Sequence, residues 1–225
     1  MRASVAVIGP TAAGKSALAM ELASYFPSEI VSVDSRQVYR GLDVGTAKPS
    51  LEERSRVPHH MIDLIDPSER TDARWFAGLA SEAMDGIKSR GRTPLLVGGS
   101  GLYLKAIREG FFDIDLDAEM RARFAAGVES RDTSSLHLEL RGIDPRSASR
   151  IHVNDRYRIV RALEVFALTG VTLTEHFRRQ RESRPGGGDE PVWATIGIKV
   201  ERSRLRDRIF QRTCAMFDAG WPEEV

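Results

Sequence analysis

The octet GPTAAGKS, residues 9–16, is the stretch of this chain with the clearest chemical meaning. It fits the pattern G-x-x-x-x-G-K-[ST] through Gly9, Gly14, Lys15 and Ser16. The glycines let backbone N–H groups turn inward around oxygen atoms, and the following helix and the lysine supply positive charge. The serine hydroxyl is the expected ligand of Mg²⁺. The octet therefore predicts a site for a diphosphate or a triphosphate.

Hydrolases that use such a loop usually add a buried strand that ends in an aspartate and helps to hold Mg²⁺. The natural candidate here is the apolar run 94–97, but Gly98, Gly99 and Ser100 follow it instead of an acid. This ending favours a phosphate compound that is held as a leaving group over one that is hydrolysed for energy.

Asp34 directly follows a second apolar run, residues 30–33. In open α/β sheets ligands bind at the C-terminal ends of the strands, which makes this carboxylate a candidate general base. The alternative role is formation of a turn with Ser35. Because like charges repel, we expect Asp34 to contact an acceptor substrate and not the phosphate.

Strands and helices alternate along the part of the chain that must position these residues. Short apolar runs predict parallel strands at 5–8, 30–33, 61–65, 94–97 and 192–200. Helical spacing of apolar residues predicts helices at 15–26, 72–91 and 203–219. The alternation predicts an α/β fold, a P-loop NTPase-like parallel sheet flanked by helices.

The middle of the chain differs in character and predicts an all-helical insertion domain. Between residues 121 and 184 there are 13 arginines, no lysine and 8 acidic residues. Arg158 and Arg161 lie opposite the apolar face of a helix predicted to start at Asn154 or Asp155 and to run to Gly170. Arginine binds phosphate bidentately and stacks on bases, so we infer a phosphate-bearing polymer as the partner. The predicted domains are 1–112, 113–190 and 191–225, with a glycine-rich hinge at 184–189.

Other features limit the class of protein. The net charge of +1 by itself indicates no partner, and the single cysteine, Cys214, excludes an internal disulfide and fits a reducing cytoplasm. The first apolar run is too short for a signal peptide or a membrane span. His59 and His60 have no acidic or cysteine neighbour at metal-ligand spacing, so we expect them in a loop or the core. Cys214 is expected to be packed.

Five stretches together resemble the tRNA dimethylallyltransferases, also called tRNA isopentenyltransferases. These stretches are GPTAAGKS, IVSVDSRQVYRGLDVGTAKP, VGGSGLY, NDRYRIVRALEVF and RIFQRTCAMFDAG. The resemblance runs essentially from end to end, and DSRQVYRGLDVGTAKP is much more specific than the phosphate loop alone. Members of the family normally continue beyond the position of Val225, so the resemblance also implies that the chain is truncated there.

The resemblance implies transfer of a dimethylallyl group from its diphosphate to N6 of the adenine next to the anticodon, on its 3′ side. The base would be drawn from its stack into a channel, as enzymes that modify bases require. The implied partners are dimethylallyl diphosphate and the anticodon stem-loop of tRNA, with Mg²⁺ as cofactor and Ser16 as its protein ligand. A cytoplasmic monomer without membrane contact is expected.

Matched residue by residue, the resemblance gives Asp34 the N6 proton, places Ser100 by the reacting adenine and Arg212 near the diphosphate. The implied donor site consists of Gly9, Thr11, Ala12, Ala13, Gly14, Lys15 and Ser16. The implied tRNA contacts are Asp34, Ser35, Arg36, Gln37, Ser100, Arg121, Tyr157, Arg158, Ile159, Val160 and Arg161. Arg156-Tyr157 departs from the Pro-Gln that is common in bacterial members. Whether Arg208 or Arg212 closes over the diphosphate stays open.

Three other functions compete with this interpretation. An isopentenyltransferase acting on free AMP, ADP or ATP would share the fold and most of the site, but the arginine-rich insertion and residues 157–161 favour tRNA. A small-molecule P-loop kinase would need ATP turnover, with Asp34 contacting a hydroxyl acceptor. An RNA-binding module with a vestigial loop is disfavoured because Lys15, Ser16 and Asp34 are intact.

Overall fold

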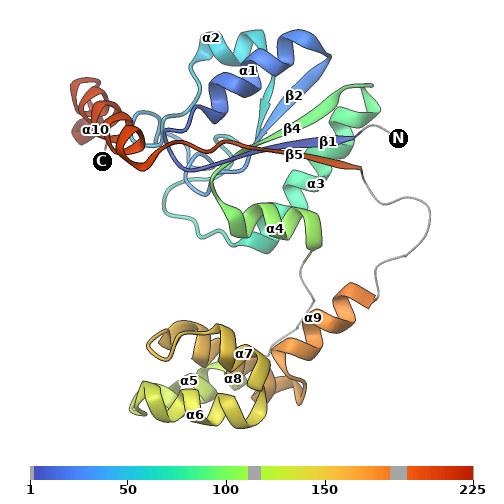
Figure 1. The fold of residues 1–225 in the computed structure, drawn as a ribbon, viewed down its shortest axis with the longest axis vertical. Helices are drawn as coiled ribbons and strands as arrows, with labels where there is room; N and C mark the ends of the chain where they lie inside the picture. The colour runs from blue at the N-terminus through green and yellow to red at the C-terminus, as the bar shows by residue number, and fades with distance from the viewer. Residues whose placement is uncertain (1–2, 111–117, 183–191, 225) are drawn as a thin grey trace. The chain divides into compact units, whose positions relative to one another are not determined.

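The computed structural model describes residues 3–110, 118–182 and 192–224. These residues form two compact units, one of Met1–Gly110 with Asp189–Val225 and one of Phe111–Gly188, and each is described by itself (Figure 1). The predicted domain limits near 112 and 190 and the predicted hinge at 184–189 lie outside the described residues.

The first unit contains a parallel sheet of five strands in the order β3-β2-β4-β1-β5. The strands are β1 (Ser4–Ile8), β2 (Ser28–Ser32), β3 (His59–His60), β4 (Thr93–Gly98) and β5 (Trp193–Gly197). β4 pairs with β1 on one side and with β2 on the other. The C-terminal ends of β1, β2 and β4 therefore lie at one edge, and the predicted P-loop-type parallel sheet is confirmed.

Both faces of the sheet are covered because neighbouring residues of each strand point to opposite sides. Ala6, Val31 and Leu96 pack with the helices α3 (Ala73–Ser89) and α4 (Gly101–Glu109). On the other face, residues such as Val7 and Leu95 pack with α1 (Lys15–Tyr25). Figure 1 shows α1 and the short α2 (Leu51–Arg56) on one side of the sheet, with α3 and α4 on the other.

The prediction of a strand at 61–65 is wrong. The strand that forms, β3, begins two residues earlier and consists of His59–His60. Met61 and Asp63 have φ angles of 65° and 56°, in the left-handed region that a β-strand does not use. Ile65 retains only an isolated bridge to Tyr39. The two histidines, expected in a loop or the core, thus form β3, the strand at one edge of the sheet.

The first unit ends in α10 (Arg202–Asp218) and the short helix α11 (Trp221–Glu224). Gly220, with a φ of 91°, separates them. Cys214 lies exposed on α10, which corrects the expectation that it is packed. No helix within the described parts of the chain has the length and apolar character needed to cross a membrane.

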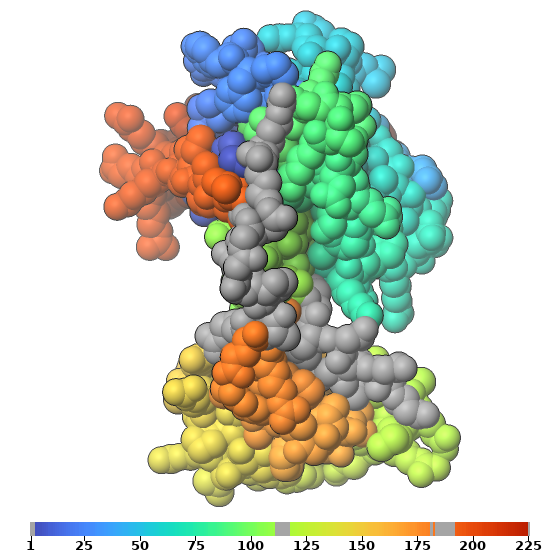
Figure 2. Space-filling model, turned by 90° about the vertical axis from the view of Figure 1, so that its right-hand side faces the viewer, coloured from blue at the N-terminus to red at the C-terminus, as the bar shows by residue number. Residues whose placement is uncertain are grey.

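The described part of the second unit is helical. It contains α5 (Ala118–Glu129), α6 (Thr133–Ile143), α7 (Pro145–Arg150), α8 (Arg156–Thr169) and α9 (Leu173–Glu182). Asp155 caps α8 by accepting a hydrogen bond from the N–H of Arg158, and Gly170, with a φ of 69°, ends it, as the sequence predicts. Figure 2 shows α9, in orange, on the surface of this unit.

Candidate active site

A pocket of about 400 Å³ opens where β1, β2 and β4 end. It brings together seven residues that the sequence predicts for the site: Gly9, Thr11, Lys15, Ser16, Asp34, Gln37 and Arg212. They come from the phosphate loop, from the end of β2 and from α10. The pocket is therefore built by segments that lie far apart in the chain.

The phosphate loop has the backbone that its glycines predict. Gly14 caps α1 with a φ of 95°, and a Cβ on Gly9 would lie 2.9 Å from the carbonyl oxygen of Ile198. The Lys15 ammonium donates to the carbonyl of Pro10 at 2.7 Å. Burial lowers the pKa of Lys15, nearby Asp34 acts to raise it, and Arg212 again lowers it. The charges of Asp34 and Arg212 thus both act on Lys15 within one site.

A second hollow, formed by the outer side of the phosphate loop and α10, adjoins the pocket at Lys15 and Ser16. The predicted donor-site residues Ala12, Ala13 and Gly14 line it, together with Arg208 and Arg212. Arg212 also reaches inward, where its Nη1 donates to the hydroxyl of Thr11 at 3.3 Å. In this structure Arg212 is thus the arginine that contacts the loop, while Arg208 lines the outer hollow.

Asp34 forms a turn and also lines the pocket. Its Oδ1 accepts a hydrogen bond from the N–H of Arg36 at 2.8 Å, which forms the turn after β2, and its side chain lines the pocket. Val33 is anchored to β4 by a bond from its N–H to the carbonyl of Val97. A Cβ on Gly98 would lie 2.0 Å from the carbonyl oxygen of Val33, so glycine is required for this close approach.

Ser100 lies outside the main pocket and lines a smaller one of about 110 Å³. The two pockets share Gly9, Gly98 and Gly99, so they meet at the end of β4. The Ser100 hydroxyl accepts a hydrogen bond from the N–H of Ser35 at 3.3 Å. The backbone N–H of Ser35 therefore ties it to the turn between β4 and α4.

Gln37 is held by three hydrogen bonds. Its Oε1 accepts from the hydroxyl of Ser32 at 2.7 Å, and its Nε2 donates to the carbonyls of Thr46 and Ala47 at 3.2 and 3.1 Å. Thr46 and Ala47 also line the pocket, although the sequence-based site omits them. Their place in the specific stretch that ends in GTAKP was the available signal.

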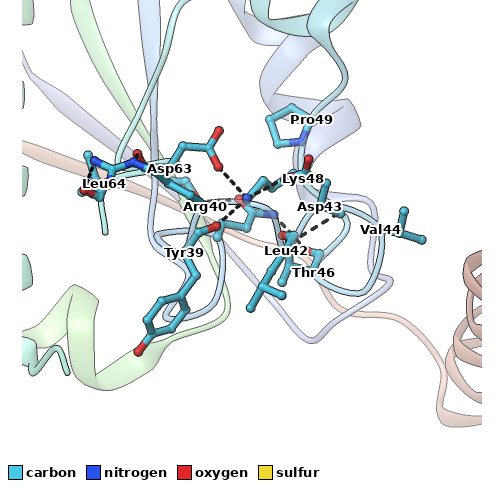
Figure 3. Close-up of polar contacts among 12 residues, drawn as sticks. Tyr39, Arg40, Leu42, Asp43, Val44, Thr46, Lys48, Pro49, Asp63 and Leu64 are labelled. Atoms are coloured by element: carbon cyan, nitrogen blue, oxygen red, sulfur yellow. Dashed lines mark hydrogen bonds and ion pairs between the residues drawn. The ribbon is translucent and has the colours of Figure 1, made fainter. Parts of the chain in front are cut away.

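Lys48 fixes the same loop from within (Figure 3). Its side chain is only 2% exposed, and the ammonium donates to the carbonyl of Tyr39 and to the carboxylates of Asp43 and Asp63 at 2.6, 2.6 and 2.5 Å. Asp63 also accepts from Arg54 at 2.8 Å. Burial opposes ionisation of Asp63, but these two cations outweigh it and lower its pKa. The buried charge is thus fully partnered, as burial demands.

One part of the pocket lining is apolar, formed by Met20, Ile30 and Val97. His59 lies beside them, with its Nδ1 2.7 Å from the carbonyl oxygen of Val57. Burial lowers the pKa of His59 despite this contact, which favours a neutral ring. The same pocket therefore offers cationic groups for phosphate and apolar surface for a hydrocarbon.

The residues of the insertion that are predicted to contact RNA differ in exposure: some lie on the surface and others are buried. Glu164, on α8, accepts from Arg121 of α5 at 3.2 Å and also pairs with Arg161, so these two arginines lie together. Tyr157 is 82% exposed and Arg158 is exposed beside Asp155, whereas Val160 is partly buried. Ile159 is 0% exposed in the core of this unit, so its side chain is not available for contact with RNA.

Arg156 has a role that sequence reasoning missed. Its guanidinium donates to the carbonyls of Val128, Glu129 and Arg131, at 2.5, 3.0 and 2.7 Å. These carbonyls lie at the C-terminal end of α5 and just beyond it, where backbone oxygens have no partner within the helix. The residue that departs from the common Pro-Gln thus ties the start of α8 to the end of α5.

The sheet order, the phosphate loop and the acid after β2 define a P-loop α/β protein with a pocket suited to a phosphorylated ligand. Residues 37–225 match the model of the family described as IPP transferase, and residues 3–63 match the model described as isopentenyl transferase. The chain belongs to the IPP transferase family.

Named relatives and solved structures agree with this membership. The chain is 48% identical over 220 residues to the tRNA dimethylallyltransferase of Halorhodospira halophila, covering 97% of this chain and 70% of that protein. It is 46% identical over 223 residues to that of Geobacter metallireducens, with 98% and 71% covered. The tRNA isopentenylpyrophosphate transferase of Bacillus halodurans superposes with a TM-score of 0.65 at 40% identity, covering 100% of this chain and 69% of that one. A eukaryotic dimethylallyltransferase acting on tRNA gives 0.75 at 27% identity, with 100% and 55% covered.

Proposed function

We propose that this protein is a tRNA dimethylallyltransferase, which transfers the dimethylallyl group of dimethylallyl diphosphate to N6 of the adenosine 3′-adjacent to the anticodon and releases diphosphate. The observation that carries the proposal is one pocket with Lys15 and the phosphate loop, Asp34, and an apolar lining. This combination suits a donor with an anionic head and a hydrocarbon tail. The names of the relatives support tRNA as the acceptor.

In the proposed reaction the allylic C–O bond of the donor breaks while a C–N bond to N6 forms. Asp34 accepts the proton that N6 loses, and the electron pair of the C–O bond leaves with the diphosphate. Negative charge grows on the leaving oxygen. We assign the stabilisation of that charge to Lys15, the N–H groups at the start of α1 and Arg212, because Lys15 and Arg212 line the same pocket and Arg212 contacts the phosphate loop.

Mg²⁺ is the proposed cofactor, and the residues present fit it. Ser16 supplies an exposed hydroxyl beside Lys15 at the start of α1. Within the described residues no group of three or more histidine, cysteine or acidic side chains could form a metal cage. That fits an ion that takes much of its shell from water and substrate phosphate. When bound, the ion would neutralise charge on the diphosphate.

The insertion unit is the proposed contact for the anticodon stem-loop, through exposed Tyr157 and through Arg121, Arg158 and Arg161. We propose that a monomer is active, as the family resemblance implies. Because the proposed substrate is tRNA, we expect the protein to work in the cytoplasm.

Prenylation of free AMP, ADP or ATP is the second candidate, because residues 3–63 match the isopentenyl transferase model. The test is to incubate the protein with Mg²⁺, dimethylallyl diphosphate and an unmodified tRNA, then to weigh the digested nucleosides. An adenosine heavier by one dimethylallyl unit, formed without ATP, supports the proposal. Prenylated AMP in a parallel reaction with no tRNA product would replace it with the second candidate. Hydrolysis of ATP without prenyl transfer would overturn both.

A further inference from the structure

The short helix α11 holds one turn of the loop 35–49, which we call the acceptor loop. The Oε2 of Glu224 accepts hydrogen bonds from the N–H groups of Asp43 and Val44 at 2.7 and 2.5 Å, and its Oε1 accepts from Gly45 at 3.0 Å. Three consecutive N–H groups thus converge on one carboxylate, the arrangement that makes a backbone anion site. Burial opposes ionisation, but the N–H donors outweigh it and lower the pKa of Glu224.

A second residue of α11 contacts the same turn. A Cβ on Gly45 would lie 2.0 Å from the Nε1 of Trp221, so the indole packs directly against the glycine backbone. The ring is in turn supported by Phe217 of α10, with 5.3 Å between ring centroids. The turn 43–45 is therefore fixed by a charged contact and by an apolar one, both from residues that sequence reasoning did not single out.

This turn leads directly into the wall of the pocket. Thr46 and Ala47 follow Gly45, and their carbonyls receive the side-chain amide of Gln37. Gln37, Thr46 and Ala47 all line the pocket. On the other side Lys48 ties Asp43 to Tyr39 and Asp63 (Figure 3). A shift of the turn would consequently move the acceptors that orient the amide of Gln37.

The segment that carries Glu224, residues 202–224, also contacts the phosphate loop, which is the proposed donor site. α10 carries Arg212, whose guanidinium reaches Thr11 of the phosphate loop. Residues 202–224 therefore contact both the phosphate loop and the acceptor loop.

We propose that Glu224 is a positioning residue, which holds the acceptor loop in register with the phosphate loop so that the acceptor nucleotide meets the donor. The proposal rests on the proposed function, because it takes the acceptor loop as the part that faces the tRNA. Loss of the carboxylate should then impair use of the tRNA and leave binding of the donor intact. Since small misplacements of reacting groups are costly, we expect kcat/KM for tRNA to fall about tenfold to hundredfold.

The test compares Glu224→Ala and Glu224→Gln with Glu223→Ala, a matched control one position earlier on the same helix, whose side chain is exposed. Amide hydrogen exchange of residues 43–45, followed by NMR, reports the contact independently of activity. Calorimetry with dimethylallyl diphosphate reports donor binding, and steady-state kinetics report kcat and KM for tRNA. Thermal unfolding shows that the variants are folded.

We expect Glu224→Ala to expose the three amides to exchange, to lower kcat/KM for tRNA and to keep the donor Kd within about twofold. Glu224→Gln retains one carbonyl acceptor, so it should lie between Glu224→Ala and the wild type. Unchanged exchange, an equal loss of donor binding, or the same defect in Glu223→Ala would overturn the proposal. If the wild type transfers no prenyl group to tRNA, the proposed function fails, and the exchange data still decide whether Glu224 holds the loop.

Discussion

The guanidinium of Arg212 lies 3.3 Å from the hydroxyl of Thr11, although 201 residues separate them in the chain. The contact joins α10 to the phosphate loop and places a fixed positive charge at the pocket that also holds Lys15 and Asp34. A guanidinium can donate two parallel hydrogen bonds to phosphate oxygens, which suits a group that holds a diphosphate.

Replacement of Arg212 should therefore weaken stabilisation of the leaving diphosphate. We expect Arg212→Ala to lower kcat/KM for dimethylallyl diphosphate by about a hundredfold, the scale of one lost electrostatic contact in a transition state. Arg206→Ala is the control, since Arg206 is exposed on the same helix and outside the pockets described. Equal losses in the two variants would remove the role assigned to Arg212.

Asp34→Asn tests the general base while keeping an oxygen that can accept from the N–H of Arg36. We expect prenyl transfer in a single turnover to slow by at least about a hundredfold, because the amide cannot take the N6 proton. The Kd of the donor, measured by calorimetry, should stay nearly unchanged, because a carboxylate does not attract diphosphate. A loss of donor binding comparable to the loss of rate would argue against this assignment.

Gly98, the last residue of β4, and Gly99, which follows it, should respond differently to replacement by alanine. In Gly98→Ala the new Cβ would lie 2.0 Å from the carbonyl oxygen of Val33, so the chain before Asp34 must move. We expect a loss of about 2 kcal/mol or more in the free energy of unfolding, measured with urea. In Gly99→Ala the nearest atoms are 3.9 Å away, and we expect little change. Equal stability of the two variants would contradict the close approach.

Glu29 should make the free energy of unfolding depend on pH in the acidic range. Its side chain is 5% exposed, and hydrogen bonds from Arg90 and His60 overcome burial and lower its pKa from 4.5 to about 2. A carboxyl whose pKa is lowered on folding stabilises the protein above its unfolded pKa, and this contribution disappears as pH falls from 4.5 toward 2. Urea unfolding should show the wild type losing on the order of 2 kcal/mol more than Glu29→Gln over that range. If the stability of the wild type and of Glu29→Gln changed in parallel with pH, this role of Glu29 would be disproved.

Substitutions of Tyr157 and Ile159 should separate effects on RNA binding from effects on the stability of the insertion unit. Tyr157→Ala removes an exposed ring, so we expect the Kd for tRNA to rise about tenfold, through lost stacking, with little effect on unfolding. Ile159→Ala empties part of the core and should cost about 3 kcal/mol of stability. Filter binding and thermal unfolding of both variants provide the measurements. A Tyr157→Ala protein that binds tRNA normally would exclude stacking on this ring.

The features that the sequence predicted correctly are those with a local cause. The strand β1, the glycine loop and α1 follow from a short apolar run, left-handed glycine and helical spacing within residues 4–25. The limits of α8 follow equally from an aspartate cap and a terminal glycine. The strand expected at 61–65 was misplaced because Met61 and Asp63 adopt left-handed backbone, which methionine rarely takes and aspartate takes only at particular positions. Contacts of Asp63 with Lys48 and Arg54 accompany that backbone.

The sequence by itself determined the chemistry of this protein, namely a phosphate loop, an acid at the end of a strand and the family stretches around them. The tertiary structure alone decided which distant groups meet. The sheet order sets β4 between β1 and β2, and the path of residues 202–224 brings Arg212 to Thr11 and Glu224 to the turn at 43–45. Local propensity acts over a few neighbouring residues, whereas these contacts join segments about 180 to 200 positions apart and form only when the sheet and its helices pack.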